Sequence, residues 1–265
     1  LPTQAGMVRD TLKAIRRKRR ERQRQAAPLR FGEAMAEGQA PPEGVTIKGL
    51  LASCGTDITG KRDAALISLA YDAGLRVSEL VGATVADLSQ AVDGSGRLEI
   101  AHSKTDQLGE GALAWLSPDT MARLSAWLLA SGITQGAVFR RINVLTSPPD
   151  DAGEQTQRHY IGQKPLTRQG VVAILRRRVF EAIDLGHVEL EAGMEGDTVR
   201  SLSAHSFRVG LTQDLFAAGE DGARSRTSSV RVESISSGSA SRDRSGHFRL
   251  TSTGIAASRN LDAAA

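Results

Sequence analysis

The sequence predicts a mainly α protein with a small antiparallel β-sheet, that is, an α+β fold. Apolar residues recur at helical spacing in several segments, whereas Arg97–His102 alternates apolar and polar residues like a half-buried strand. The composition, 40% hydrophobic and 24% charged, is ordinary for a globular protein. A single cysteine, Cys54, excludes an intramolecular disulfide and a cysteine-based zinc site.

Residues 1–30 are predicted to form a strongly basic helix. Its few apolar residues share one face, and Pro28 ends it. Between Arg9 and Arg30 ten lysines and arginines are opposed only by Asp10 and Glu21. A cluster this dense favours a phosphate backbone as its partner. A solvated helix face or an artificial N-terminal extension would explain it as well.

Composition divides the rest of the chain into a linker, a packed domain and a tail. Residues 31–44 are rich in proline and glycine, which predicts a linker, and residues 45–220 have the pattern of a packed domain. Residues 221–265 contain eleven serines and seven arginines without apolar periodicity, which predicts a disordered tail. In the packed domain we expect helices at 45–51, 63–73, 77–81, 118–130, 168–182 and 205–218, strands at 97–102 and 112–116, and a loop at 144–164.

One motif points to a nucleotide but departs from the required pattern. Gly55–Lys61 matches the first seven places of a phosphate-binding P-loop. The eighth place should be a serine or threonine that holds magnesium, and here it is Arg62. No buried strand is predicted before the motif. We therefore reject an NTPase function.

Three separated segments carry the residues of chemical interest. Arg76 lies at the junction of two apolar helices, Lys104 lies at the tip of a predicted hairpin, and His205 and Arg208 are three residues apart on one helix. Each has an ordinary explanation when taken alone. Glu79 can pair with Arg76, for example, and Lys104 can be a solvated turn residue.

In this order the segments GLRVSEL, HSKTD and HSFR resemble the motifs of the tyrosine recombinase (phage integrase) family. The similarity covers about residues 7–220 and includes PLTRQG at the start of the helix before HSFR. The resemblance implies a recombinase-type catalytic domain at 45–220. It also implies that residues 1–30 are the remnant of an N-terminal core-binding domain.

The resemblance also implies roles for the residues. Arg76 and Arg208 would bind the non-bridging oxygens of a DNA phosphodiester, and Lys104 would protonate the departing 5′ oxygen. His205 would assist proton transfer or orient the phosphate. No metal and no cofactor is implied. The DNA contacts are assigned to exposed cations of the basic helix and of the PLTRQG motif, namely Arg16, Arg17, Lys18, Arg19, Arg20 and Arg168.

The family pattern breaks after Asp221, where its nucleophilic tyrosine should follow. The chain has only Tyr71, within an apolar helix, and Tyr160, on the wrong side of HSFR. A histidine, His247, lies too far from Arg208 to match the pattern. The expected nucleophile is therefore not found, and we expect an inactive enzyme.

These observations define the partners and the competing functions. We expect double-stranded DNA as the partner, no membrane and a cytoplasmic location. The family self-associates as tetramers on DNA, and the loss of the C-terminal pattern argues against that here. The alternatives are a non-catalytic DNA-binding protein derived from an integrase and a partner-binding helical protein whose arginines form internal ion pairs. The DNA site and the direction of recombination are not predicted.

The abrupt change near residue 222 leads to a first prediction. We hypothesise that a reading-frame shift, or the decay of a gene remnant in a mobile element, produced the Ser/Arg-rich tail. Translation of the coding DNA beyond codon 222 in the other two frames should then restore a Trp or His followed by Arg-Tyr. If neither frame contains this pattern, the frameshift hypothesis is wrong.

Overall fold

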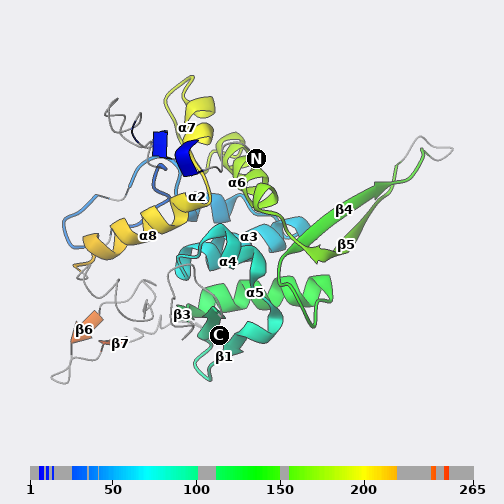
Figure 1. Ribbon diagram of the computed structural model, residues 1–265, viewed down its shortest axis with the longest axis horizontal. Helices are drawn as coiled ribbons and strands as arrows, with labels where there is room; N and C mark the ends of the chain where they lie inside the picture. Colours follow the sequence, from blue (N-terminus) through cyan, green and yellow to red (C-terminus); the bar gives the residue numbers. More distant parts are fainter. Residues whose placement is uncertain are drawn as a thin grey trace, which may run out of the picture.

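The predicted fold class is confirmed. The computed structural model describes residues 6–8, 10–11, 14, 26–34, 36–40, 42–100, 112–149, 155–219, 240–242 and 248–250. Within these residues helices predominate, and the strands pair antiparallel in small sheets (Figure 1). Of the Ser/Arg-rich segment, only the short paired strands β6 (Ala240–Arg242) and β7 (Phe248–Leu250) are described.

Helix α3 (Ile58–Asp72) is the centre of the fold. It is buried over most of its length and packs against α2 (Ile47–Ala52), α5 (Pro118–Ser131) and α8 (His205–Ala217). The Asp57 side chain caps it by accepting hydrogen bonds from the backbone N–H groups of Thr59 and Gly60, at 3.2 and 2.9 Å. The segment that imitates a P-loop is therefore the capped start of a buried helix.

The other predicted helices are present with small shifts at their ends. These are α4 (Val77–Gly82), α5, α6 (Arg168–Asp184) and α8. The Thr167 side chain accepts a hydrogen bond from the Gly170 N–H at 3.0 Å and so caps α6. Two short elements were not predicted, α7 (Glu195–Ser201) and the 3₁₀-helix η2 (Val85–Asp87), because they contain too few apolar residues for a periodic signal.

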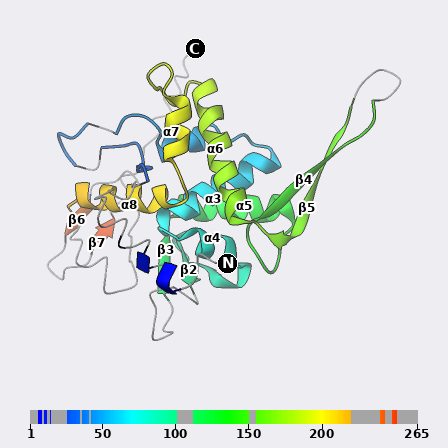
Figure 2. The same ribbon diagram turned by 45° about the horizontal axis from the view of Figure 1, so that its top comes forward.

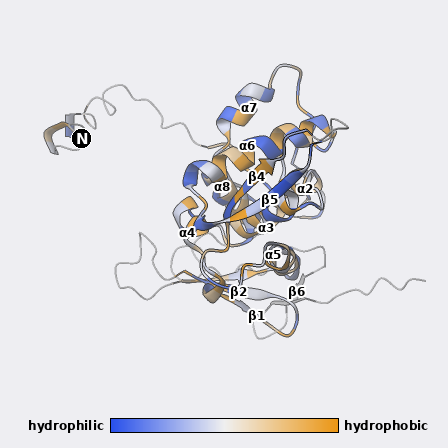
Figure 3. Cartoon of the chain, turned by 90° about the vertical axis from the view of Figure 1, so that its right-hand side faces the viewer, coloured by the Kyte–Doolittle hydropathy of each residue, from blue (hydrophilic) through white to orange (hydrophobic). Residues whose placement is uncertain are grey.

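The predicted sheet is present and gains a third strand. Its order is β1 (Leu88–Gln90), β2 (Gly96–Ile100) and β3 (Ala112–Leu116), with antiparallel neighbours. Leu98 pairs with Ala114, and both are buried. Figures 1 and 3 place the sheet with α5 at one end of the molecule and α6 and α7 at the other.

The expectation of a loop at 144–164 was wrong. Strands β4 (Arg140–Thr146) and β5 (Gln157–Pro165) form an antiparallel ribbon that projects from the body of the protein (Figures 1 and 2). Nearly all its residues are exposed, so neither face produces the alternation of apolar and polar residues by which a strand is recognised. The prolines that suggested a loop, Pro148 and Pro149, lie just beyond the end of β4.

The segment 26–31 runs through the interior beside α8. Leu29 is fully buried, and its N–H donates to the Ser206 carbonyl at 3.0 Å. On the other side of the segment, the Ile47 N–H donates to the Arg30 carbonyl at 2.9 Å. A Cβ atom on Gly210 would lie only 1.8 Å from the Leu29 carbonyl oxygen. Gly210 therefore allows the segment to pass against the helix.

This close approach leads to a prediction for stability. Gly210→Ala should lower the free energy of unfolding by about 3 kcal/mol, because backbone must move to admit the methyl group. Gly82→Ala is the matched control, since nothing lies within 4 Å of a Cβ at that helical position. Urea unfolding of both variants measures the difference. Equal stability of the two variants would show that the segment does not pack as described.

Candidate functional site

Two arginines far apart in the sequence meet where α4 and α8 begin. Arg76 is the N-cap residue of α4, and Arg208 lies in the first turn of α8. The N–H and Nη1 of Arg76 donate to the Glu79 carboxylate at 2.8 and 2.7 Å. The packing of α3 against α8 brings the two arginines together, and Gly74, with φ +54°, makes the tight turn between α3 and α4.

The electrostatics of this pair favour an anion. Burial lowers the pKa of Arg208 below its usual value, the charge of Arg76 lowers it further, and Glu79 partly opposes both effects. Among the described residues, the half-buried Arg208 guanidinium has no hydrogen bond and no ion pair. The two guanidinium groups act on each other as like charges, and a phosphate bound by both would relieve that repulsion.

Of the other predicted site residues, the structure describes only His205 and Arg168. His205 is exposed and precedes Arg208 by one turn on α8, and its N–H donates to the Ser203 hydroxyl at 3.2 Å. Arg168 is the exposed first residue of α6. Lys104 lies outside the described residues, as do Arg16, Arg17, Lys18, Arg19 and Arg20.

A buried carboxylate that the sequence analysis missed holds α8 in place. Asp214 is fully buried and accepts hydrogen bonds from Arg30 Nε and the Phe31 N–H at 2.6 and 2.7 Å. The Tyr71 hydroxyl donates to it at 2.6 Å. Burial and the Asp214 charge raise the pKa of Tyr71, so its hydroxyl keeps its proton. Tyr71 is therefore a structural residue, as its apolar helix predicted.

A second buried carboxylate organises a cluster of arginines between α3 and α6. Asp63 is fully buried and accepts hydrogen bonds from Arg62 Nε at 2.9 Å, from Arg178 Nε at 2.7 Å, and from Arg177. Arg178 also pairs with Glu181. Arg62 and Arg178 are each only 5% exposed, so they cannot reach a ligand. Arg177 and Arg178 of α6 thus serve packing, which spacing alone does not reveal.

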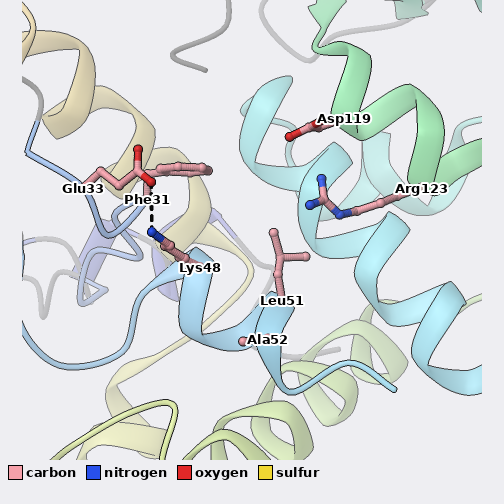
Figure 4. Close-up of a pocket in the computed structure, with 7 residues that line it drawn as sticks. All are labelled: Phe31, Glu33, Lys48, Leu51, Ala52, Asp119 and Arg123. Carbon is pink, nitrogen blue, oxygen red and sulfur yellow. Dashed lines mark hydrogen bonds and ion pairs between the residues drawn. The ribbon is translucent and has the colours of Figure 1, made fainter. Parts of the chain in front are cut away.

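A shallow hollow borders the Asp214 network at Phe31. It has a volume of about 410 Å³ and lies between the segment after Leu29, α2 and α5 (Figure 4). Its charged residues are of both signs, and Lys48 Nζ is 3.0 Å from Glu33 Oε1. Neither arginine of the pair lines it. Its lining is Phe31, Glu33, Lys48, Leu51, Ala52, Asp119 and Arg123.

The described residues show neither a candidate metal site nor a candidate membrane span. They contain no group of three or more His, Cys, Asp or Glu side chains that could hold a metal ion. Nor do they include a helix that is both long enough and apolar enough to span a membrane. Burial raises the pKa of the only cysteine, Cys54, to about 12, so this thiol is protonated at neutral pH.

Comparison with known proteins identifies one curated relative and several structural neighbours. The chain is 32% identical over 152 residues to the integrase/recombinase XerD homologue of Selenomonas ruminantium. The match covers 55% of this chain and 41% of the relative, so the chain spans less than half of that protein's length. This similarity confirms the predicted resemblance to the tyrosine recombinases. No protein-family model matches the chain.

Two of the structural neighbours are also recombinases. The XerH site-specific recombinase bound to its difH substrate aligns with a TM-score of 0.42 at 16% identity, covering 72% of this chain and 43% of that chain. The XerA recombinase aligns with a TM-score of 0.38 at 12% identity, covering 72% of this chain and 65% of that chain.

The shared role of Glu79 generates a prediction. Glu79→Gln should lower the free energy of unfolding by about 2 kcal/mol, because it removes the carboxylate that pairs with Arg76 and opposes the repulsion between the two guanidinium groups. The double variant Glu79→Gln/Arg208→Gln should be more stable than Glu79→Gln alone, since one of the repelling charges is gone. Urea unfolding at low ionic strength measures both variants. A double variant that is less stable than the single one would contradict that repulsion.

Proposed function

We propose that this chain is a catalytic domain of tyrosine recombinase type, the kind that cleaves and rejoins DNA in site-specific recombination or integration. We further propose that the chain as it stands binds duplex DNA without cutting it. The observation that carries the proposal is the meeting of Arg76 and Arg208 around one carboxylate. In this proposal residues 45–220 are the catalytic domain and residues 1–30 are a basic helix. Residues 31–44 link the two, and residues 221–265 are a separate tail.

The proposed site acts on a phosphodiester by electrostatics. The guanidinium groups of Arg76 and Arg208 bind the two non-bridging oxygens, whose negative charge grows as phosphorus becomes pentavalent. His205, one turn away on α8, orients the phosphate or moves a proton. Lys104 is assigned the protonation of the 5′ oxygen through the family resemblance. Arg168 and the cluster Arg16–Arg20 neutralise phosphates along the duplex.

The attacking group is the missing part of this chemistry. In the family, a tyrosine hydroxyl would displace the 5′ oxygen and form a covalent 3′-phosphotyrosine. Tyr71 cannot take that role, because its hydroxyl is buried against Asp214. Tyr160 is on the projecting ribbon, outside the HSFR region. Binding without cleavage is therefore the function that the described residues support best.

Binding at this site can be tested with single variants. The intact protein should bind a fluorescein-labelled 40-base-pair duplex of mixed sequence, and its affinity should fall steeply with salt. Arg208→Ala should weaken binding and reduce the slope of log K against log salt by about 1, because one phosphate contact is lost. Arg200→Ala is the matched control, since Arg200 is exposed on α7 and paired with Asp197. Fluorescence anisotropy across a salt series gives both quantities.

Two results would overturn parts of this proposal. Incubation with a nicked suicide duplex should yield no protein–DNA adduct that survives denaturant, and such an adduct would refute the non-cleaving state. Failure of the intact protein to bind the duplex at low salt would refute DNA binding altogether. That second outcome would favour a helical protein that binds another protein and uses its arginines internally.

A further inference from the structure

Among the described residues, the ribbon formed by β4 and β5 is exposed along most of its length. Val144, Leu145 and Tyr160 are 52%, 58% and 49% exposed, although they lie in regular strands. An isolated two-stranded hairpin is only marginally stable in water. A ribbon that projects as in Figure 2 therefore has two solvent-facing surfaces on which another molecule can be bound.

The base of the ribbon is firmly attached to the body. Ile142 and Ile161 pair with each other and pack against the core. Arg140 Nε donates to the Ala137 carbonyl at 3.0 Å, and its guanidinium also bonds the Gln135 carbonyl. The Leu166 N–H donates to the Phe139 carbonyl at 2.8 Å. The ribbon is thus held in a fixed direction where it leaves the body.

The strand register places several cationic side chains on one face of the β4–β5 ribbon. Directly opposed residues share a face, and side chains alternate along each strand. The pairs Asn143–Tyr160 and Leu145–Arg158 therefore lie on one side. The register shifts between Arg140 and Ile142. A Cβ on Gly162 would nevertheless lie 3.8 Å from both Arg141 Cβ and Asn143 Nδ2, so Arg141 falls on that side too, and Lys164 lies two residues after Gly162 in β5. We call this set the cationic face: Arg141, Asn143, Leu145, Arg158, Tyr160 and Lys164.

The described strands and their flanks contain no acidic residue to offset these cations. Residues 140–149 and 155–165 include no Asp or Glu. Arg140 is engaged with the body, whereas the side chains of Arg141, Arg158 and Lys164 belong to exposed residues. The charge of the described strands therefore favours a polyanion as the partner.

We propose that the cationic face of the β4–β5 ribbon lies in a groove of the duplex DNA that the protein binds. A seven-residue strand spans roughly 20 Å, and the major groove, about 12 Å wide, admits a two-stranded ribbon. Arg141, Arg158 and Lys164 bind backbone phosphates, and Asn143 offers an amide to base edges. This inference rests on the proposed DNA-binding function and adds a second contact to it.

The test uses the full chain and two triple variants with equal loss of charge. The first variant removes the three cations of the ribbon and is called the arm variant: Arg141→Ala/Arg158→Ala/Lys164→Ala. The control, Lys48→Ala/Arg176→Ala/Arg200→Ala, removes three exposed cations from α2, α6 and α7. With the 40-base-pair duplex of mixed sequence, the arm variant should bind roughly tenfold more weakly at 0.1 M salt, with a salt slope smaller by about 3. The control should change the slope by less than about 1.

A second variant separates a specific contact from net charge. Replacing residues 143–160 with Asn-Gly joins the paired Ile142 and Ile161 by a two-residue turn. The replacement removes one arginine and three carboxylates, so the net charge rises from +4 to +6. Net charge alone predicts tighter DNA binding, whereas the proposed contact predicts binding that is several-fold weaker. Circular dichroism and a thermal transition check that this variant and the arm variant are folded.

The outcomes distinguish the ribbon from the site. If the arm variant binds like its control while Arg208→Ala still weakens binding, the ribbon proposal is wrong and the proposed function stands. If the intact protein does not bind the duplex at all, both fail. Sedimentation velocity without DNA tests the alternative, that the ribbon is an interface between two copies of this chain. A self-associated protein that becomes monomeric only in the arm variant would make the ribbon an interface between copies and overturn the DNA contact.

Discussion

The buried carboxylate of Asp214 is the interaction on which the arrangement of the site depends. It ties three parts of the chain together: the segment at Arg30 and Phe31, Tyr71 on α3, and its own helix α8. A buried charge is tolerated only when its oxygens are well paired, so these three donors must arrive together. Arg76 follows Tyr71 and Arg208 precedes Asp214, each within about two helical turns. The same bonds that satisfy Asp214 therefore set the spacing of the arginine pair.

The chain uses arginine in two different ways, which differ in whether the guanidinium groups are fully paired with carboxylates. Around Asp63, Arg62 and Arg178 are buried and fully engaged, so their charges stabilise the contact between α3 and α6. At the other cluster, Glu79 satisfies Arg76, while Arg208 stays half-buried with no hydrogen bond among the described residues. Like charges held close together cost stability, and an incoming phosphate offsets that cost. Arg208 is therefore the guanidinium group that the proposed function makes available to a phosphate.

Sequence reasoning succeeded where the pattern is local and failed where it depends on contacts between distant segments. The helices were predicted because Thr167 and Ser117 are good caps and the apolar residues recur at helical spacing. Arg76, His205 and Arg208 were found because their motifs resemble a family. The β4–β5 ribbon was missed because neither of its faces is buried, and Asp214 was missed because a single aspartate in a helix gives no signal. Its three donors come from 143 and more residues away, so only the fold reveals them.

The position of Tyr71 shows why this tyrosine could not attack a phosphate held at the proposed site. An attacking hydroxyl must be exposed and must lose its proton in the reaction. Tyr71 is the tyrosine nearest in sequence to Arg76, yet its proton is held by Asp214, and removing it would place two negative charges in contact in the core. Freeing that hydroxyl would also break the network that sets the arginine pair. The bonds that hold this tyrosine in the core thus prevent it from serving as the nucleophile, and in the proposed function cleavage would need a tyrosine from another segment.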